Sequence, residues 1–183
     1  MIKLSVIDRA LVALWLATVA VFLSMVFISI PEVVFWQPEL KIFDARFCGY
    51  SIHAAREFLQ AIGPEGREVY RGSQRYLDTV FPALFSCALV WSFLRCMPMH
   101  WGAWRLLPIV LSVLVGVFDY LENSAVQTML TMSVESLPEA MVQKASFYTQ
   151  TKYVLFAVTT MVFIYCMARA YIIKNTSPRY SRA

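Results

Sequence analysis

Charged residues are scarce in this sequence. They make up only 15% of its 183 residues, whereas hydrophobic residues make up 59%. Soluble globular domains typically contain about 25% charged residues, so the composition excludes an ordinary soluble domain. It predicts a chain that lies in a lipid bilayer.

The familiar signatures of catalysis and metal binding are also missing. The sequence has no phosphate-binding loop, no dinucleotide-binding glycine pattern, no HExxH and no GxSxG. Its four cysteines form no CxxC, and its two histidines, His53 and His100, are expected on opposite sides of the membrane. These observations argue against a haem held by two histidines, a zinc site and a thiol redox centre, so we expect no metal and no cofactor.

Four apolar runs are long enough to cross about 30 Å of hydrocarbon. They cover residues 10–30, 77–94, 106–125 and 152–171. The first run is longer than the core of a signal peptide, and no small-x-small cleavage site follows it, so we expect a retained helix. The sequence therefore predicts an all-α, polytopic membrane protein. Residues 1–173 would form a single four-helix transmembrane domain, and 174–183 a flexible cytoplasmic tail.

Basic residues indicate the orientation of these spans. If the N-terminus is inside, the inner segments contain eight basic residues and only one acidic residue, Asp8. The eight are Lys3, Arg9, Arg95, Arg105, Arg169, Lys174, Arg179 and Arg182. Because short inner loops are enriched in Lys and Arg, both termini are expected in the cytoplasm.

The segment between the first two spans, residues 31–76, is long for a connector. Ser51 can cap a helix over about 51–62, which Gly63 and Pro64 would end. Five residues would give this segment an apolar side: Phe43, Phe47, Phe58, Leu59 and Ile62. We predict an extracytoplasmic helical cap, which either packs on the bundle or binds a partner.

Asp78 and Pro82 mark a polar face of the second span. Proline has no N–H, so the carbonyl of Asp78, four residues earlier, loses its normal helical donor. In hydrocarbon such a carbonyl needs a donor from a neighbouring helix, a polar side chain or water. We therefore expect Asp78 to face the interior of the bundle.

The third span ends in the stretch GVFDYLENSA, residues 116–125, which contains three polar residues on one helix face. Asp119, Glu122 and Asn123 are spaced by three and four residues. At about 1.5 Å per residue from Leu106, Asp119 lies about 20 Å into the bilayer, near the level of Asp78. A carboxylate facing lipid at that depth costs on the order of 2.5–3.5 kcal/mol, so this face is expected to turn inward.

Lys152 supplies the countercharge. The sequence Ser136-Leu137-Pro138-Glu139 resembles a capping box, which predicts a fourth helix from about Leu137 and places Lys152 at the same level. The candidate ligand-binding residues are Asp78, Asp119, Glu122, Asn123 and Lys152, with Arg75 just above them. Three carboxylates then face one lysine, and we expect Asp119 or Glu122 to hold a proton. The alternative is a polar network that only joins the helices.

Two further patterns concern packing and charge. Arg67, Arg71 and Arg75 follow one helix face, which faces either solvent and headgroups or an anionic ligand. Ser112 and Gly116 form a small-xxx-small pair, which is suited to close helix approach.

Three short motifs carry a family resemblance. Gly66-Arg67-x-x-Tyr70, Asp78-x-x-Phe81-Pro82 and Asp119-x-x-Glu122-Asn123 resemble recurrent motifs of small bacterial four-helix integral membrane proteins of uncharacterised function. The resemblance covers about 48–171, and it implies an architecture without an activity or assigned catalytic residues.

These observations predict a multi-pass protein of the bacterial inner (plasma) membrane. We expect a binding or accessory protein with an outward-facing intramembrane polar pocket for a lipid-like or small ligand. One alternative is a membrane enzyme that uses Asp119 or Glu122 as acid and base on an apolar substrate. Others are a structural subunit of a larger complex and a small proton- or cation-coupled transporter. Membrane lipids are expected partners, a membrane-protein partner or a homo-oligomer is left open, and nucleic acid is not expected.

Overall fold

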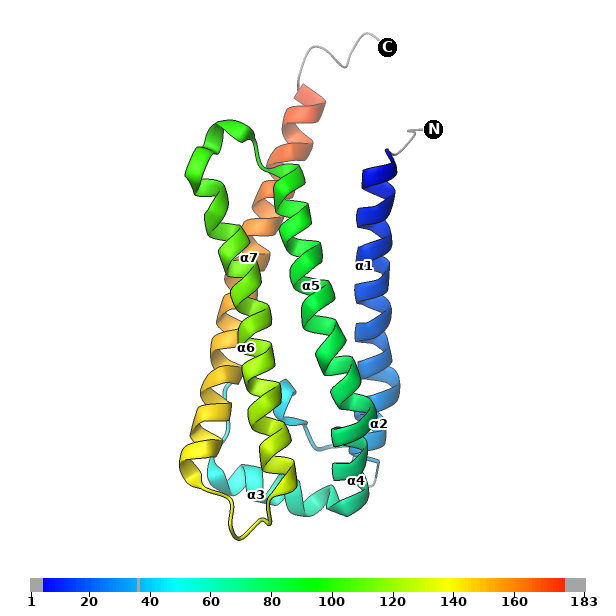
Figure 1. The fold of residues 1–183 in the computed structure, drawn as a ribbon, viewed down its shortest axis with the longest axis vertical. Helices are drawn as coiled ribbons and strands as arrows, with labels where there is room; N and C mark the ends of the chain where they lie inside the picture. Colours follow the sequence, from blue (N-terminus) through cyan, green and yellow to red (C-terminus); the bar gives the residue numbers. More distant parts are fainter. Residues whose placement is uncertain (1–4, 36, 177–183) are drawn as a thin grey trace.

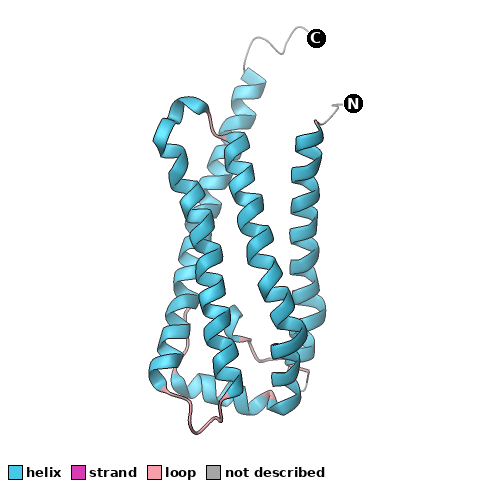
Figure 2. Cartoon of the chain, viewed as in Figure 1, coloured by secondary structure: helices cyan, strands magenta, loops and turns pink. Residues whose placement is uncertain are grey.

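The chain folds into long helices that run side by side (Figures 1 and 2). The computed structural model describes residues 5–35 and 37–176, and no strand occurs among them. Four helices are long and apolar enough to cross a membrane, as predicted: Val6–Val33, Gly63–Cys96, Met99–Thr131 and Glu139–Ile172. Each helix extends beyond its predicted apolar run. The first span begins and the last one ends at the same end of the bundle (Figure 1).

The first span contains α1 (Val6–Ser24), a π-helical segment η1 (Met25–Ser29) and α2 (Ile30–Val33). The Ser5 side chain caps α1 by accepting a hydrogen bond from the backbone N–H of Asp8. Pro31, which cannot donate a backbone hydrogen bond, directly follows the π-helical turn. The wider turn lets the helix continue past the proline.

The second span also contains a π-helical segment. It is composed of α4 (Gly63–Val69), η3 (Tyr70–Gln74) and α5 (Arg75–Cys96). Tyr70 and Gln74, which begin and end η3, are both fully buried. The two π-helical segments are neighbours, and the hydroxyl oxygens of Ser29 and Ser73 lie 3.4 Å apart.

The third and fourth spans form a hairpin. A 3-10 helix η4 (Met99–Arg105) leads into α6 (Leu106–Thr131), and α7 (Glu139–Thr176) returns. The capping box predicted at Ser136 is wrong, because its hydroxyl hydrogen-bonds within the turn to Ser133 and α7 begins only at Glu139. The tail predicted from residue 174 is still helical up to Thr176, and 177–183 lie outside the described residues.

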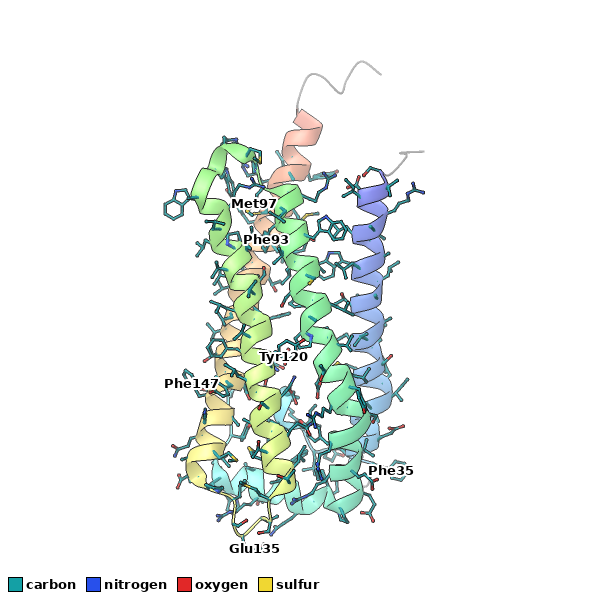
Figure 3. The ribbon with its side chains drawn as sticks, in the orientation of Figure 1. Phe35, Phe93, Met97, Tyr120, Glu135 and Phe147 are labelled. Atoms are coloured by element: carbon teal, nitrogen blue, oxygen red, sulfur yellow. The ribbon has the colours of Figure 1, made fainter. Side chains whose placement is uncertain are left out.

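Helix α6 packs most extensively on α7 and on α5, whereas α1 packs mainly on α5 (Figure 1). Gly116 lets α6 approach α5 closely, since a Cβ there would lie 2.5 Å from the Ser86 hydroxyl. At the same crossing, the Tyr120 hydroxyl donates to the carbonyl of Thr79 over 2.7 Å (Figure 3). Trp15 joins α1 to the bundle by donating to Ser92 over 3.0 Å.

A helical cap covers the end of the bundle away from the chain ends. It contains η2 (Phe43–Ala45) and α3 (Ile52–Ala61), together with α4. Its apolar core combines the cap with the ends of α6 and α7: Phe43, Phe58, Leu59, Tyr70, Met129, Leu130 and Val142. Phe47, which was predicted on the same apolar side, is instead 59% exposed.

Arg67 fastens the cap to α6. Its guanidinium donates to the carbonyl of Leu59 at the end of α3, over 3.1 Å, and to that of Met132 beyond α6, over 2.8 Å. Arg71 and Arg75 are exposed. The three arginines therefore do not form one continuous basic surface, because Arg67 turns toward carbonyl groups that have no helical donors.

Candidate functional site: a buried acid cluster around Lys152

The ammonium group of Lys152 on α7 contacts three carboxylates from three different elements. It forms an ion pair with Glu122 on α6 and lies 3.4 Å from Asp119 Oδ1, one turn earlier on the same helix. It lies 3.4 Å from Oδ1 of Asp44 in η2. With Asp78, these carboxylates form what we call the acid cluster: Asp44, Asp78, Asp119 and Glu122.

Asp44 did not emerge from the sequence as a site residue, yet three side chains hold it against the spans. Besides Lys152, the hydroxyl of Tyr70 donates to Asp44 Oδ2 over 2.6 Å, and that of Tyr153 donates to the Asp44 carbonyl over 2.8 Å. Phe43, directly before it, is fully buried in the cap. Part of the site therefore comes from the segment between the spans.

Glu122 is the most enclosed member of the cluster. Its side chain has no exposed surface, and the Thr149 hydroxyl donates to its Oε1 over 2.5 Å. Thr149 precedes Lys152 by about one turn of α7, so both side chains reach the same carboxylate. This pair of contacts fixes α6 against α7 at the level of the cluster.

Asp78 joins the cluster from α5. Its exposed fraction is 4%, and its Oδ1 accepts a hydrogen bond from Gln74 Nε2 over 2.7 Å. Asn123 on α6 donates to the carbonyl of Asp78 over 2.9 Å and to Asp119 Oδ1 over 3.3 Å. A neighbouring helix therefore supplies the donor that Pro82 withholds.

Arg75, the remaining candidate, stays outside the cluster. It is exposed, and no ion pair joins it to Asp78 among the described residues. Asp78 is held instead by Gln74, one residue before Arg75. The structure thus brings together five of the six predicted residues and adds Asp44, Gln74 and Thr149.

The cluster has more acid than base. Oxygen atoms of Asp44, Asp119 and Glu122 lie within 4.8 Å of one another, a spacing that fits a small cation. Among the described residues, Lys152 is the only cationic side chain that pairs with them. Since like charges repel strongly where water is scarce, an occluded group of this composition favours binding of protons or a cation.

The cap next to the cluster also contains shielded polar groups. Burial raises the pKa of Tyr50, and the nearby charge of Glu122 raises it further. Its phenol therefore stays neutral over the physiological range. Burial lowers the pKa of Arg46, whose guanidinium lies over the rings of Phe43, Tyr50 and Phe58 at 5.3–6.0 Å.

Two hollows lie in the same half of the molecule. A cavity of about 160 Å³ is bordered by α2 and α4, with Val33, Ile62 and Gly66 in its wall. A shallower one is lined by Arg67, Arg71 and Leu130. Neither is lined by a residue of the acid cluster, whose charged atoms contact one another.

Comparison of the chain with models of known protein families, with curated proteins and with solved structures found no match. The resemblance to small bacterial four-helix membrane proteins therefore stays a prediction.

Proposed function

We propose that this chain is an integral membrane binding protein whose acid cluster takes up a small positively charged ligand, a proton or a small cation. The observation that carries this proposal is the contact of one ammonium group, that of Lys152, with three carboxylates. Lys152 cannot neutralise all of them at once. A further positive charge lowers the repulsion among the acids, so its uptake is favourable.

The compact geometry favours a small ligand over a lipid-like one. Lys152 lies within 3.4 Å of its carboxylate partners, and Glu122 has no exposed surface. A headgroup would have to separate these groups, whereas a proton needs only an oxygen lone pair. A small cation could take the position of the ammonium group among the three oxygens.

We also propose an orientation in a bacterial inner membrane. The chain begins and ends at one end of the bundle, which also contains Arg95, Arg105 and Arg169, and the acid cluster lies nearer the other end. The tendency of Lys and Arg to stay inside supports a cytoplasmic position for both termini. The cluster would then exchange its ligand with the outer side.

Cation and proton binding can be tested by ligand-linked stability. We would measure the thermal unfolding midpoint of the purified protein in detergent while NaCl, CaCl2 or pH is varied at fixed ionic strength. A ligand that binds the folded protein at 100 times its Kd adds about 2.7 kcal/mol to stability. We expect acidification or one of the salts to raise the midpoint of the wild type.

The control variants separate binding from a purely structural network. The double variant Asp119→Asn/Glu122→Gln should lose the response, whereas Glu135→Gln, an exposed acid in the α6–α7 turn, should keep it (Figure 3). If the double variant shifts the midpoint but responds to salt and pH like the wild type, the cluster is only structural and the proposal is wrong.

A further inference from the structure

Asp78 is a buried carboxylic acid without an ion-pair partner. Its exposed fraction is 4%, and no lysine or arginine pairs with it among the described residues. Its side chain accepts one hydrogen bond, from the amide nitrogen of Gln74. A charged carboxylate in such surroundings is unfavourable unless several donors or a cation satisfy it.

The partner of Asp78 is itself incompletely satisfied. Gln74 is fully buried, and its amide oxygen Oε1 has no hydrogen-bond partner, although its amide nitrogen lies 2.7 Å from Asp78 Oδ1. Buried amide oxygens normally have a donor, so this orphan acceptor requires an explanation. It belongs to the same planar amide group whose nitrogen already contacts the carboxyl group.

We propose that Asp78 binds a proton on its second carboxyl oxygen and donates it to Gln74 Oε1. The amide and the neutral acid then form a two-bond pair: Gln74 Nε2–H to Asp78 Oδ1, and Asp78 Oδ2–H to Gln74 Oε1. One proton from the surrounding water satisfies the orphan acceptor and removes the unpaired charge together. Loss of that proton leaves a carboxylate oxygen near an amide oxygen, which is repulsive.

The charges around Asp78 fit this assignment. Asp44 from η2, Asp119 from α6 and Lys152 from α7 act on it electrostatically, and the buried phenol of Tyr70 lies in η3, one turn before Gln74. Two of these three charges are negative, and Lys152 is already engaged by Asp44, Asp119 and Glu122. This inference rests on the proposed function in taking the acid cluster as the binding site, and it names a proton as the ligand there.

Infrared spectroscopy can detect the proton directly. A neutral carboxylic acid has a carbonyl stretching band that is separate from the bands of carboxylates and amides. We would record spectra of the purified protein at neutral and alkaline pH. The wild type should show the band of a protonated acid at neutral pH, and Asp78→Asn should lack it, because the asparagine amide cannot carry an ionisable proton.

Gln74→Leu tests the role of the amide. The Asp78 carbonyl loses its donor in this variant, so its band should move to higher frequency or disappear as Asp78 ionises. Gln127→Leu is the matched control: this glutamine also has an unpartnered side-chain oxygen, but its nitrogen donates to the Tyr70 carbonyl. It should leave the band unchanged.

The outcomes are distinct from those of the salt and pH titrations. Identical acid bands in the wild type and Asp78→Asn would overturn the assignment of the proton to Asp78. A band that moves equally in Gln74→Leu and Gln127→Leu would overturn the pairing with Gln74. Either result leaves the response of Asp119 and Glu122 unaffected, and the infrared result stands even if no salt binds.

Discussion

Asn123 on α6 donates a hydrogen bond of 2.9 Å to the backbone carbonyl of Asp78 on α5. This carbonyl lacks its helical donor because Pro82 follows four residues later. The same amide nitrogen lies 3.3 Å from Asp119 Oδ1. One side chain therefore satisfies a break in the neighbouring helix and holds a carboxylate of the acid cluster.

Replacement of Asn123 by leucine should destabilise the protein by about 1–2 kcal/mol, since a carbonyl is left without a donor in a poorly hydrated place. The loss should be smaller in a Pro82→Ala background, where residue 82 supplies an N–H. Reversible unfolding in mixed detergent micelles gives the four free energies of this double-mutant cycle. Equal losses in the two backgrounds would mean that the bond to the carbonyl contributes nothing.

Loss of the Lys152 ammonium group should be far more damaging. Lys152→Met leaves three carboxylates without their cation and should cost about 3–5 kcal/mol. Lys144→Met, two turns earlier on α7 and exposed, is the matched control and should have little effect. Adding Glu122→Gln to Lys152→Met should recover part of the lost stability. If the two lysine variants unfold at the same temperature, the ion pairs of Lys152 are not significant for stability.

The hydroxyl of Tyr70 should contribute through its bond to Asp44. Tyr70→Phe removes a 2.6 Å hydrogen bond to a carboxylate, and a loss of about 1.5–3 kcal/mol is expected. Tyr76→Phe, where the ring is 75% exposed, serves as the control. Limited proteolysis of the segment before α3 should also become faster in Tyr70→Phe alone. Unchanged cleavage and stability would show that Asp44 is held without this bond.

Gly49 should tolerate no side chain. Its φ of +81° is left-handed, and a Cβ would lie 2.2 Å from Gln150 Nε2 and 2.6 Å from Ser146 Oγ. Those two side chains hold the cap by bonding the Cys48 carbonyl and the Tyr50 N–H. Gly49→Ala should therefore cost about 2–3 kcal/mol.

The comparison for Gly49→Ala is Gly72→Ala. A Cβ at Gly72 meets no atom within 4 Å, and this helical position should gain about 0.5–1 kcal/mol from alanine. Thermal unfolding of both variants, followed by circular dichroism, gives the two shifts. Equal shifts of the same sign would rule out a special role for the Gly49 backbone.

The four spans and much of the acid cluster could be predicted from the sequence because hydrocarbon restricts the choices so strongly. An apolar run of sufficient length has to be helical, and a charged residue inside it has to find a partner. That reasoning places Asp119 and Glu122 opposite Lys152, and it assigns a donor to the carbonyl before Pro82. It does not settle which membrane side each end faces.

Asp44 could not be found in this way. It lies in an irregular segment without helical periodicity, and its approach to Lys152 depends on the fold of the whole cap. A signal did exist for Gln74: Tyr70, Gln74 and Asp78 are spaced by four residues, which places polar groups on one face. The stripe of Arg67, Arg71 and Arg75 on the same segment gave a more obvious pattern, and it does not form one surface.

The hairpin of α6 and α7 has a consequence for biogenesis. Lys152 pairs with Asp119 and Glu122 inside the hairpin, whereas Asp44 comes from a segment synthesised more than a hundred residues before Lys152. A helix that entered the membrane alone with an unpaired lysine or two carboxylates would be penalised. The last two helices should therefore leave the translocon together, with the earlier segment settling onto them afterwards.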